Sequence, residues 1–341
     1  MKHITIKDVA KELNCSISTV SRAHNDKYDI RPETRDKILK VAREMGYSPN
    51  PIARKLTQKQ SFNIGVVVPE FINSFFPNVI IGMQKVFAKN GYQVLIMQSN
   101  ENLENELKNL KTLVDNFVDG IIISFTKETN NIDYINQLIE RNYPIVLFNR
   151  VHNSLQVSKV VFDDYKMSFF ATEHIINQGK KNLVHLSGPK YLSLSENRKK
   201  GFLDACRKHK IFVSNNSIIE TKFLLKNGIE IVKKFHKSNK MPDAFVCVND
   251  PTAVGVIKGL KKYGYKIPDD VAVIGFSETE MASLIEPKLS SVKQPLEEMG
   301  ATAAELLLEQ IESKTFISPK TIVMNGELVY RASSNKKKPK K

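Results

Sequence analysis

The sequence predicts two parts: a small all-α headpiece that contains a helix-turn-helix, and a large α/β core made of two doubly wound parallel sheets. Three observations support this prediction. Apolar residues recur at helical spacing within the first sixty residues. Beyond residue 62, strand patterns alternate strictly with helix patterns, which favours parallel sheets covered by helices on both faces. The alternation occurs in two successive sets, which is typical of two lobes that close on a ligand between them.

Two short helices are expected at the N-terminus. The segment TIKDVAKEL, residues 5–13, places its apolar residues on one helical face. Thr5 is a suitable N-cap, and Asp8 lies three residues later, where its carboxylate can reach back. Ser16 offers a second N-cap for a helix that runs to His24. A turn of about three residues between two such helices is the spacing of a DNA-binding helix-turn-helix.

The second helix carries the residues expected to contact DNA, because a recognition helix presents its N-terminal residues to the major groove. Arg22 can donate two hydrogen bonds to guanine, which discriminates by about 1–3 kcal/mol. Ile17 can pack on a thymine methyl group, and Ser18 shares the exposed face. Phosphate contacts are expected from short polar side chains, namely Ser16, Thr19, Ser21 and Asn25.

A third helix is predicted from Pro32, a favourable first-turn residue, to a stop at Gly46. The following segment, SPNPIARKLTQKQS, contains two prolines and many polar residues, which indicates a linker. Ile52, Ala53 and Leu56 nevertheless lie at helical spacing within it. A short conditional helix is therefore compatible with this linker.

The strands and helices of the core are predicted from its alternating patterns. Strands are predicted at residues 63–70, 93–99, 118–125, 144–150, 160–164, 182–188, 217–221, 243–250 and 271–276. Helices are predicted at residues 77–92, 104–118, 134–142, 168–179, 196–210, 227–237 and 251–264. Ligands in such sheets usually bind at the carboxyl ends of the strands, where the sequence places Phe125, Asn149, Arg150, Asn249 and Asp250.

Charge is concentrated at the ends of the chain. Of the formal net charge of +15, residues 1–60 contribute +6 and the final KKKPKK contributes +5, so the 275 residues between them carry only +4. A basic headpiece on a nearly neutral body is typical of a polyanion-binding protein.

No apolar run is long enough for a membrane span, and no secretory signal is recognisable, so a cytoplasmic location is expected. The spacing of Cys15, Cys206 and Cys247 predicts free thiols, and no metal site or cofactor is predicted.

The segments TIKDVAKELNCSISTVSR and RPETRDKILKVAREMGYSPNPIARKL resemble the headpiece and linker of the LacI/GalR family of bacterial repressors, nearly continuously over residues 4–58. The resemblance implies a hinge helix that forms only on the operator, with Leu56 wedged into the minor groove to kink the DNA. It also implies a homodimer on a pseudo-palindromic operator, with higher assembly left open. The DNA-binding set is thereby extended to Thr5, Tyr47, Asn50, Ala53, Arg54, Lys55 and Leu56.

The core resembles the same family, whose core is similar to a periplasmic sugar-binding protein, through DGIIIS, ATEHIINQGKKNLVHLSGP, ENRKKGF, VNDPTAVGV, IPDDVAVIGF and LSSVKQP. Three chain crossings between the halves are implied. The expected domains are the headpiece at 1–49, the hinge at 50–61, the N-terminal subdomain at 62–161 with 293–322, the C-terminal subdomain at 162–290 with 323–331, and a basic flexible tail at 332–341.

The resemblance also implies a small-molecule effector, a sugar or sugar derivative, bound between the two subdomains. Its contacts are expected from Asn73, Phe75, Phe76, Phe125, Asn149, Arg198, Phe223, Asn249, Asp250, Ser277 and Glu278. Several residues also have a purely structural interpretation. Arg198 could be a solvated helix charge, Phe75, Phe76 and Phe125 could be core residues, and Asn249 and Asp250 could cap the helix that starts at Pro251.

The sequence departs from the family pattern after VAVIGF. The family commonly places an aspartate there that contacts the ligand, whereas this chain has Ser277 followed by Glu278. Either Glu278 takes over the contact, or the ligand differs from a neutral hexose. The identity of the effector therefore stays open.

Four functions are compared. The preferred interpretation is a DNA-binding regulator, expected to be a repressor, whose operator affinity is controlled by the effector. An enzyme is disfavoured, because the chain lacks GxSxG, GxGxxG and P-loop motifs and because Asp163 and Asp164 would face opposite sides of a strand. A transport binding protein is disfavoured by the helix-turn-helix. The alternative that stays open is a regulator whose core serves only for dimerisation.

Overall fold

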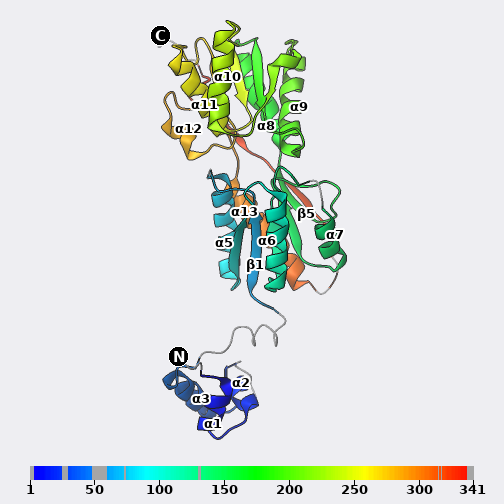
Figure 1. Cartoon of the computed structure of the whole chain (residues 1–341), viewed down its shortest axis with the longest axis vertical. Coiled ribbons are helices and arrows are strands. Elements are labelled where there is room, and N and C mark those ends of the chain that lie inside the picture. Colours follow the sequence, from blue (N-terminus) through cyan, green and yellow to red (C-terminus); the bar gives the residue numbers. More distant parts are fainter. Residues whose placement is uncertain are drawn as a thin grey trace. The chain divides into compact units, whose positions relative to one another are not determined.

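The computed structural model describes residues 4–24, 30–47, 60–72, 74–129, 132–313, 315 and 317–335. The chain divides into two compact units, Met1–Ser61 and Phe62–Lys341, which Figure 1 shows as the headpiece and the core. Among the described residues, no helix is both long and apolar enough to span a membrane. Cys206 and Cys247 are buried and Cys15 is partly buried, and all three are free thiols, as the spacing predicts.

The headpiece contains the helices α1 (Ile6–Glu12), α2 (Ile17–His24) and α3 (Pro32–Glu44) in its described part. The predicted caps are present. The backbone N–H of Thr5 donates to Asp8 Oδ2 at 2.8 Å, and the backbone N–H of Thr19 donates to Ser16 Oγ at 3.1 Å. Each cap satisfies a backbone donor that the first turn of a helix leaves without a partner.

A single apolar cluster holds the headpiece helices together. Val9 on α1, Val20 on α2 and Ile38 on α3 are its central buried residues, and smaller alanines fill the space between them. The third helix ends before Gly46, which has a φ of +72°, a left-handed conformation that glycine adopts without strain. The helix-turn-helix and the third helix thus form as the apolar spacing predicts.

The first lobe of the core is a six-stranded parallel sheet with the order β11-β5-β4-β3-β1-β2. Its strands are β1 (Asn63–Val68), β2 (Gln93–Gln98), β3 (Gly120–Ile123), β4 (Ile145–Phe148), β5 (Ser158–Phe162) and β11 (Thr321–Met324). Its helices are α5 (Phe75–Lys89), α6 (Leu103–Asp115), α7 (Asp133–Glu140) and α13 (Leu296–Glu312). Figure 1 shows β1 running between α5 and α6.

Both faces of the four inner strands of this sheet, β1, β3, β4 and β5, are buried, and neighbouring residues of one strand pack into different clusters. Ile122 of β3 packs with apolar residues of α5 and α13. Ile121 and Ile123, on the other face, pack with residues of α6 and α7. Continuous apolar strands are the expected sequence of a parallel sheet that is covered on both sides.

The second lobe is a four-stranded parallel sheet with the order β7-β6-β8-β9. Its strands are β6 (Leu183–Ser187), β7 (Ile218–Glu220), β8 (Ala244–Cys247) and β9 (Ala272–Ile274). Its helices are α8 (Asp164–Asn177), α9 (Ser193–Lys208), α10 (Leu225–Lys237), α11 (Asp250–Lys262) and the short α12 (Glu280–Leu284). All the strands and helices predicted for the core from its alternating pattern are therefore present. The strand expected at 160–164 ends earlier, because Asp163 caps α8 and Asp164 is its first residue, so the two carboxylates do not lie on a strand.

Three chain segments join the lobes within the described residues. They follow β5, lie around β10 (Ser291–Lys293) and include β12 (Glu327–Val329), and β10 and β12 pair antiparallel. Two expected boundaries are wrong. The tail expected at 332–341 begins too early, because Ser333 and Ser334 are completely buried and the hydroxyl of Ser333 donates to the carbonyl of Val273. Residues 323 and 324 belong to β11, which pairs along its whole length with β5 in the first lobe. The return to the second lobe therefore begins after Met324, and Ser333 then accepts a hydrogen bond from the backbone of Val273 in β9.

Helices α10 and α11 approach each other at two glycines. A Cβ atom on Gly255 would lie 2.0 Å from the carbonyl oxygen of Leu225, and one on Gly228 would lie 2.2 Å from that of Thr252. Only glycine allows this approach of two backbones. The close packing holds the first turn of each helix against the other helix, and both first turns lie at the cavity described below.

Candidate nucleic-acid interface and ligand cavity

The predicted DNA-reading surface is the exposed side of α2. Val20 and Ala23 face the headpiece core. The opposite side presents Ile17, which is 45% exposed, together with Ser18 and Arg22. An exposed apolar side chain beside hydroxyl and guanidinium groups matches the chemistry of a major-groove edge. These contacts stay predictions, because they concern bound DNA.

The other headpiece residues divide into two groups. Thr5 is exposed but already bonded to Asp8 through its backbone and its hydroxyl. Tyr47 packs edge-on against His24, with ring centroids 5.4 Å apart, so it also supports the end of α2. Thr19 and Ser21 lie on α2, and the hydroxyl of Ser16 caps that helix. Six predicted residues lie outside the described residues: Asn25, Asn50, Ala53, Arg54, Lys55 and Leu56.

One supporting residue of the headpiece was missed. Arg35 on α3 donates from Nε to the carbonyl oxygen of Ala23, 3.3 Å away, near the end of α2. The bond satisfies a carbonyl that the last turn of a helix leaves without an intrahelical donor. No spacing signal distinguishes Arg35 from the other charged residues of α3.

The core contains a cavity of about 720 Å³ that is lined from both lobes. Its walls lie where strands end and helices begin, which is the usual ligand position in parallel α/β sheets. The described lining residues are Glu70, Ile72, Phe75, Phe76, Glu101, Lys127, Asn149, Arg150, Pro189, Leu194, Arg198, Lys222, Phe223, Leu224, Leu225, Lys226, Asn249, Pro251, Ser277, Thr279 and Met281.

Seven predicted effector contacts line this cavity: Phe75, Phe76, Asn149, Arg198, Phe223, Asn249 and Ser277. Phe75 and Phe76 are also packed into the core, so their structural interpretation applies, and their contact with a ligand stays a prediction. Asn249 makes two contacts within the protein. Its Oδ1 accepts from the backbone of Thr252 and caps α11, while its Nδ2 donates to the carbonyl of Phe223.

Three predicted contacts are placed elsewhere, and Asn73 lies outside the described residues. Phe125 is buried in the cluster on the far face of the first sheet. Asp250 is completely buried and accepts hydrogen bonds from Thr279 and from Ser291 Oγ of β10. Glu278 forms an ion pair with Arg331. Asp250 and Glu278 therefore act within the protein at the junction of the lobes, and neither lines the cavity.

Arg198 reaches the cavity as half of a buried ion pair. Its Nε and Nη2 lie 2.8 and 2.7 Å from Asp164 Oδ1, and Nη1 donates to the carbonyl of Val248. The guanidinium carbon lies 3.6 Å from the ring centre of Phe276. Burial lowers the pKa of Arg198 and raises the pKa of Asp164, and each partner opposes the shift of the other. The interpretation of Arg198 as a solvated charge is wrong.

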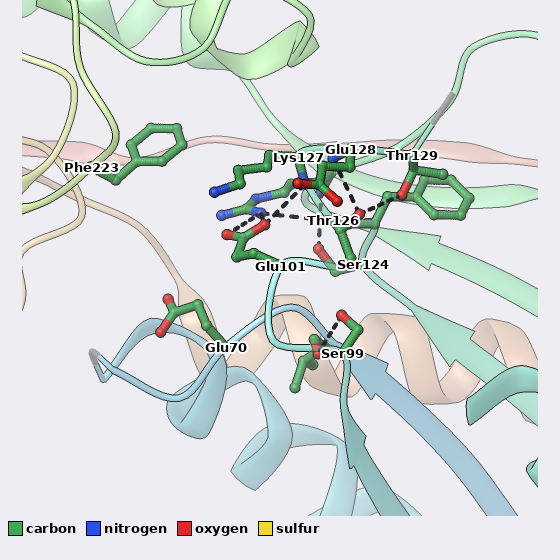
Figure 2. A network of polar contacts seen from close by, with 12 residues as sticks. Glu70, Ser99, Glu101, Ser124, Thr126, Lys127, Glu128, Thr129 and Phe223 are labelled. Carbon is green, nitrogen blue, oxygen red and sulfur yellow. Dashed lines mark hydrogen bonds and ion pairs between the residues drawn. The ribbon is translucent and has the colours of Figure 1, made fainter. Parts of the chain in front are cut away.

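Arg150 forms a second ion pair at the cavity. Its Nη1 lies 2.8 and 3.0 Å from the two carboxylate oxygens of Glu101. Its guanidinium carbon lies between two aromatic rings, 5.8 Å from the centre of Phe76 and 5.6 Å from that of Phe223. Figure 2 shows Glu101 at the centre of the polar network, with Phe223 facing it from the second lobe.

Glu106 lies behind this network and is 1% exposed. Its carboxylate accepts from the backbone of Thr126 at 2.7 Å and from Thr129 Oγ1 at 2.8 Å. Burial raises the pKa of Glu106 to about 7, because desolvation penalises the charged form more than these bonds favour it. Burial also raises the pKa of Asp250 to about 7.

Five charged residues of the cavity are absent from the predicted set: Glu70, Glu101, Lys127, Lys222 and Lys226. A usable signal exists, because these residues follow the ends of β1, β2, β3 and β7 by two to six positions. The rule that ligands bind beyond the carboxyl ends of strands would have included them.

A helix-turn-helix headpiece joined to a two-lobed α/β core defines the protein as a DNA-binding transcriptional regulator. Residues 5–50 match the family described as "Bacterial regulatory proteins, lacI family", and residues 172–334 match the periplasmic binding protein-like domain. The chain is 31% identical over 314 residues to the catabolite control protein A of Priestia megaterium, covering 92% of this chain and 94% of that protein.

Two further comparisons, one of sequence and one of fold, agree with these matches. The chain is 30% identical to the ribose operon repressor of Halalkalibacterium halodurans, covering 91% of each chain. The fold matches the lac repressor dimer bound to operator and the anti-inducer ONPF, with a TM-score of 0.86, 22% identity, and coverage of 98% of this chain and 99% of that one. The chain therefore belongs to the LacI family, as its motifs predict. The relatives are named as regulators and not as enzymes.

Proposed function

We propose that the protein is a transcriptional repressor whose affinity for its operator is set by a carbohydrate effector bound in the cavity. The single observation that supports this most strongly is the cavity itself, which has a suitable volume and receives walls from both lobes. Phe76 and Phe223 offer apolar faces, and Asn149 and Ser277 offer hydrogen-bonding groups. Carbohydrates present both apolar ring faces and hydroxyl edges, so the lining suits them. The ribose operon repressor is a relative named for a sugar.

The proposed binding of DNA uses two headpieces. One headpiece presents a short recognition helix, which is too small to hold a specific site alone. A two-fold dimer would place two such helices in successive major grooves of a pseudo-palindromic operator. A regulator of this kind acts on the chromosome, so the proposed location is the cytoplasm.

The proposed switch uses the two lobes. Because Arg150 belongs to one lobe and Phe223 to the other, a ligand that contacts both favours the closed arrangement. A ligand shifts an equilibrium only by its difference in affinity for the two states. Binding in the cavity therefore changes operator affinity only if the closed and open cores hold the headpieces differently.

The test uses full-length protein and a DNA duplex that the protein itself selects from a random library. Fluorescence anisotropy measures operator affinity with and without each member of a carbohydrate panel. At least one carbohydrate should change the affinity, and Phe223→Ala should abolish the change. Phe212→Ala is the matched control, because Phe212 is 90% exposed and does not line the cavity. Calorimetry that finds no carbohydrate binding would leave the core as a dimerisation module only.

A further inference from the structure

We infer that the effector is an anionic carbohydrate, a sugar phosphate or a sugar acid, whose negative group is bound by Lys127, Lys222 and Lys226 at the cavity. The inference rests on the proposed function, because it assigns the class of ligand to the same cavity. It follows from the charged lining residues that have no ion pair within the protein.

Both arginines of the cavity are already neutralised. Arg198 is paired with Asp164, and Arg150 donates hydrogen bonds to both carboxylate oxygens of Glu101. The backbone N–H of Lys127 also donates to Glu101, at 2.9 Å. Glu101 and Asp164 thus have their charge compensated within the protein, and neither is available to balance the lysines.

The three lysines have no such partner. Lys127 follows β3 in the first lobe, whereas Lys222 and Lys226 lie on either side of Phe223 and of the start of α10 in the second lobe. Within the described residues, none of their ammonium groups has an ion pair or a hydrogen bond. The lysines come from both lobes, so an anion between them contacts both sides of the cavity.

One lining carboxylate opposes these charges. Glu70 lies below the network in Figure 2. Its carboxylate accepts a hydrogen bond from the backbone of Ile72. Three ammonium groups against this one carboxylate leave the cavity positive, and Glu70 can still accept a bond from a sugar hydroxyl at its own end.

The helices add to the positive potential. Helices α5, α9, α10 and α11 all begin at the cavity, because residues of their first turns line it. Helix N-termini carry a partial positive charge and favour anions. The first turns of α9 and α11 contain Glu196 and Asp250, whereas those of α5 and α10 have no acidic residue. Lys226 lies in the first turn of α10. Together with the lysines, these helix ends favour a ligand with a negative group over a neutral one.

The experiment is isothermal titration of the full-length protein with matched pairs of ligands. Glucose is compared with glucose 6-phosphate, and galactose with galacturonate, while inorganic phosphate alone controls for simple ion binding. In at least one pair, the anionic member should bind about tenfold more tightly, because its negative group forms charge-assisted hydrogen bonds with the lysines. The two pairs distinguish a phosphate from a carboxylate. Raising the salt concentration should weaken the anionic member more than the neutral one.

The variant Lys222→Gln/Lys226→Gln should reduce the preference for the anionic member to about threefold or less. The matched control is Lys233→Gln, an exposed lysine of the same helix that does not line the cavity. It should keep the full preference. Circular dichroism of both variants checks that they are folded.

The outcomes separate the two proposals. Tight binding of neutral sugars, with no gain from a negative group, overturns the inference and leaves the proposed function standing. An anionic preference that survives Lys222→Gln/Lys226→Gln overturns the assignment to these lysines. An anionic ligand that binds in the cavity without changing operator affinity supports the inference and contradicts the proposed regulation. Binding of neither class contradicts both.

Discussion

The headpiece and the cavity expose their functional groups in opposite ways. In the headpiece, Ile17 is 45% exposed on a helix whose other side is packed. In the cavity, Arg198 is 4% exposed and its charge is already used by Asp164. Under the proposed function, groups on the headpiece surface serve a partner, whereas groups of the cavity wall serve both the ligand and the fold. Substitutions on the headpiece surface should change DNA affinity without changing stability. Substitutions in the cavity wall should change both ligand affinity and stability.

The largest effect is expected for Arg198→Ala. It leaves the carboxylate of Asp164 buried without its cation, which should lower the free energy of unfolding of the core by about 3–5 kcal/mol. Urea denaturation followed by fluorescence or circular dichroism measures the change. Replacing both residues, Arg198→Met with Asp164→Leu, should restore much of the loss. An Arg198→Ala core as stable as the wild type would contradict the buried ion pair.

The pH dependence of stability tests the polar network behind the cavity. The pKa of Glu106 is raised from 4.5 to about 7 in the folded protein. Its contribution is therefore fully present below about pH 4.5 and is lost as the pH rises to about 7, where the folded protein must bury a carboxylate. Glu106→Gln removes this titration. The difference in unfolding free energy between the variant and the wild type should move in favour of the variant by about 3 kcal/mol between pH 5 and pH 8. A constant difference would show that Glu106 does not titrate in this range.

Arg22→Ala tests the headpiece side of the comparison. It should cost about 1–3 kcal/mol of operator affinity and relax the base preference at one position. Selection from a random DNA library, followed by anisotropy, measures both changes. Arg43→Ala, an exposed arginine of α3, is the control and should leave the base preference unchanged. An equal loss on specific and random DNA would show that Arg22 contacts phosphate instead.

The smallest effect is expected for Ser16→Ala. The hydroxyl of Ser16 accepts from the backbone N–H of Thr19 at the start of α2. Its loss should lower the stability of the headpiece by about 1 kcal/mol, as at other N-caps. The thermal midpoint of the headpiece transition is the readout. Ser18→Ala removes a hydroxyl that lies 2.7 Å from Ser16 Oγ but leaves the bond from Thr19 to Ser16 in place, so it should have a smaller effect.

The same contrast explains what the sequence could predict. The caps Thr5 and Ser16, the apolar faces and the alternating strands follow local rules, and all are present. The partners of the cavity arginines do not follow such rules. Asp164 lies 34 residues before Arg198, and Glu101 lies 49 residues before Arg150. Only the folded sheet brings these pairs together.

The errors have the same origin. Asp250 was expected to contact the ligand because it follows β8, but its side chain turns inward to Thr279 and Ser291. The lobe boundary at 322 was misplaced because a four-residue strand pairs with β5, which is distant in sequence. A position at the end of a strand indicates that a residue lies near the cavity. It does not indicate the direction in which the side chain points.

The central claim is that the cavity and the headpiece are coupled, and reciprocity tests it most directly. Once a carbohydrate from the panel is found to bind, its affinity is measured with and without operator DNA, and operator affinity is measured with and without the carbohydrate. Thermodynamic linkage requires both ratios to be the same, and the account predicts a common factor of about 5–150. A carbohydrate that saturates the cavity and leaves operator affinity unchanged would contradict the claim.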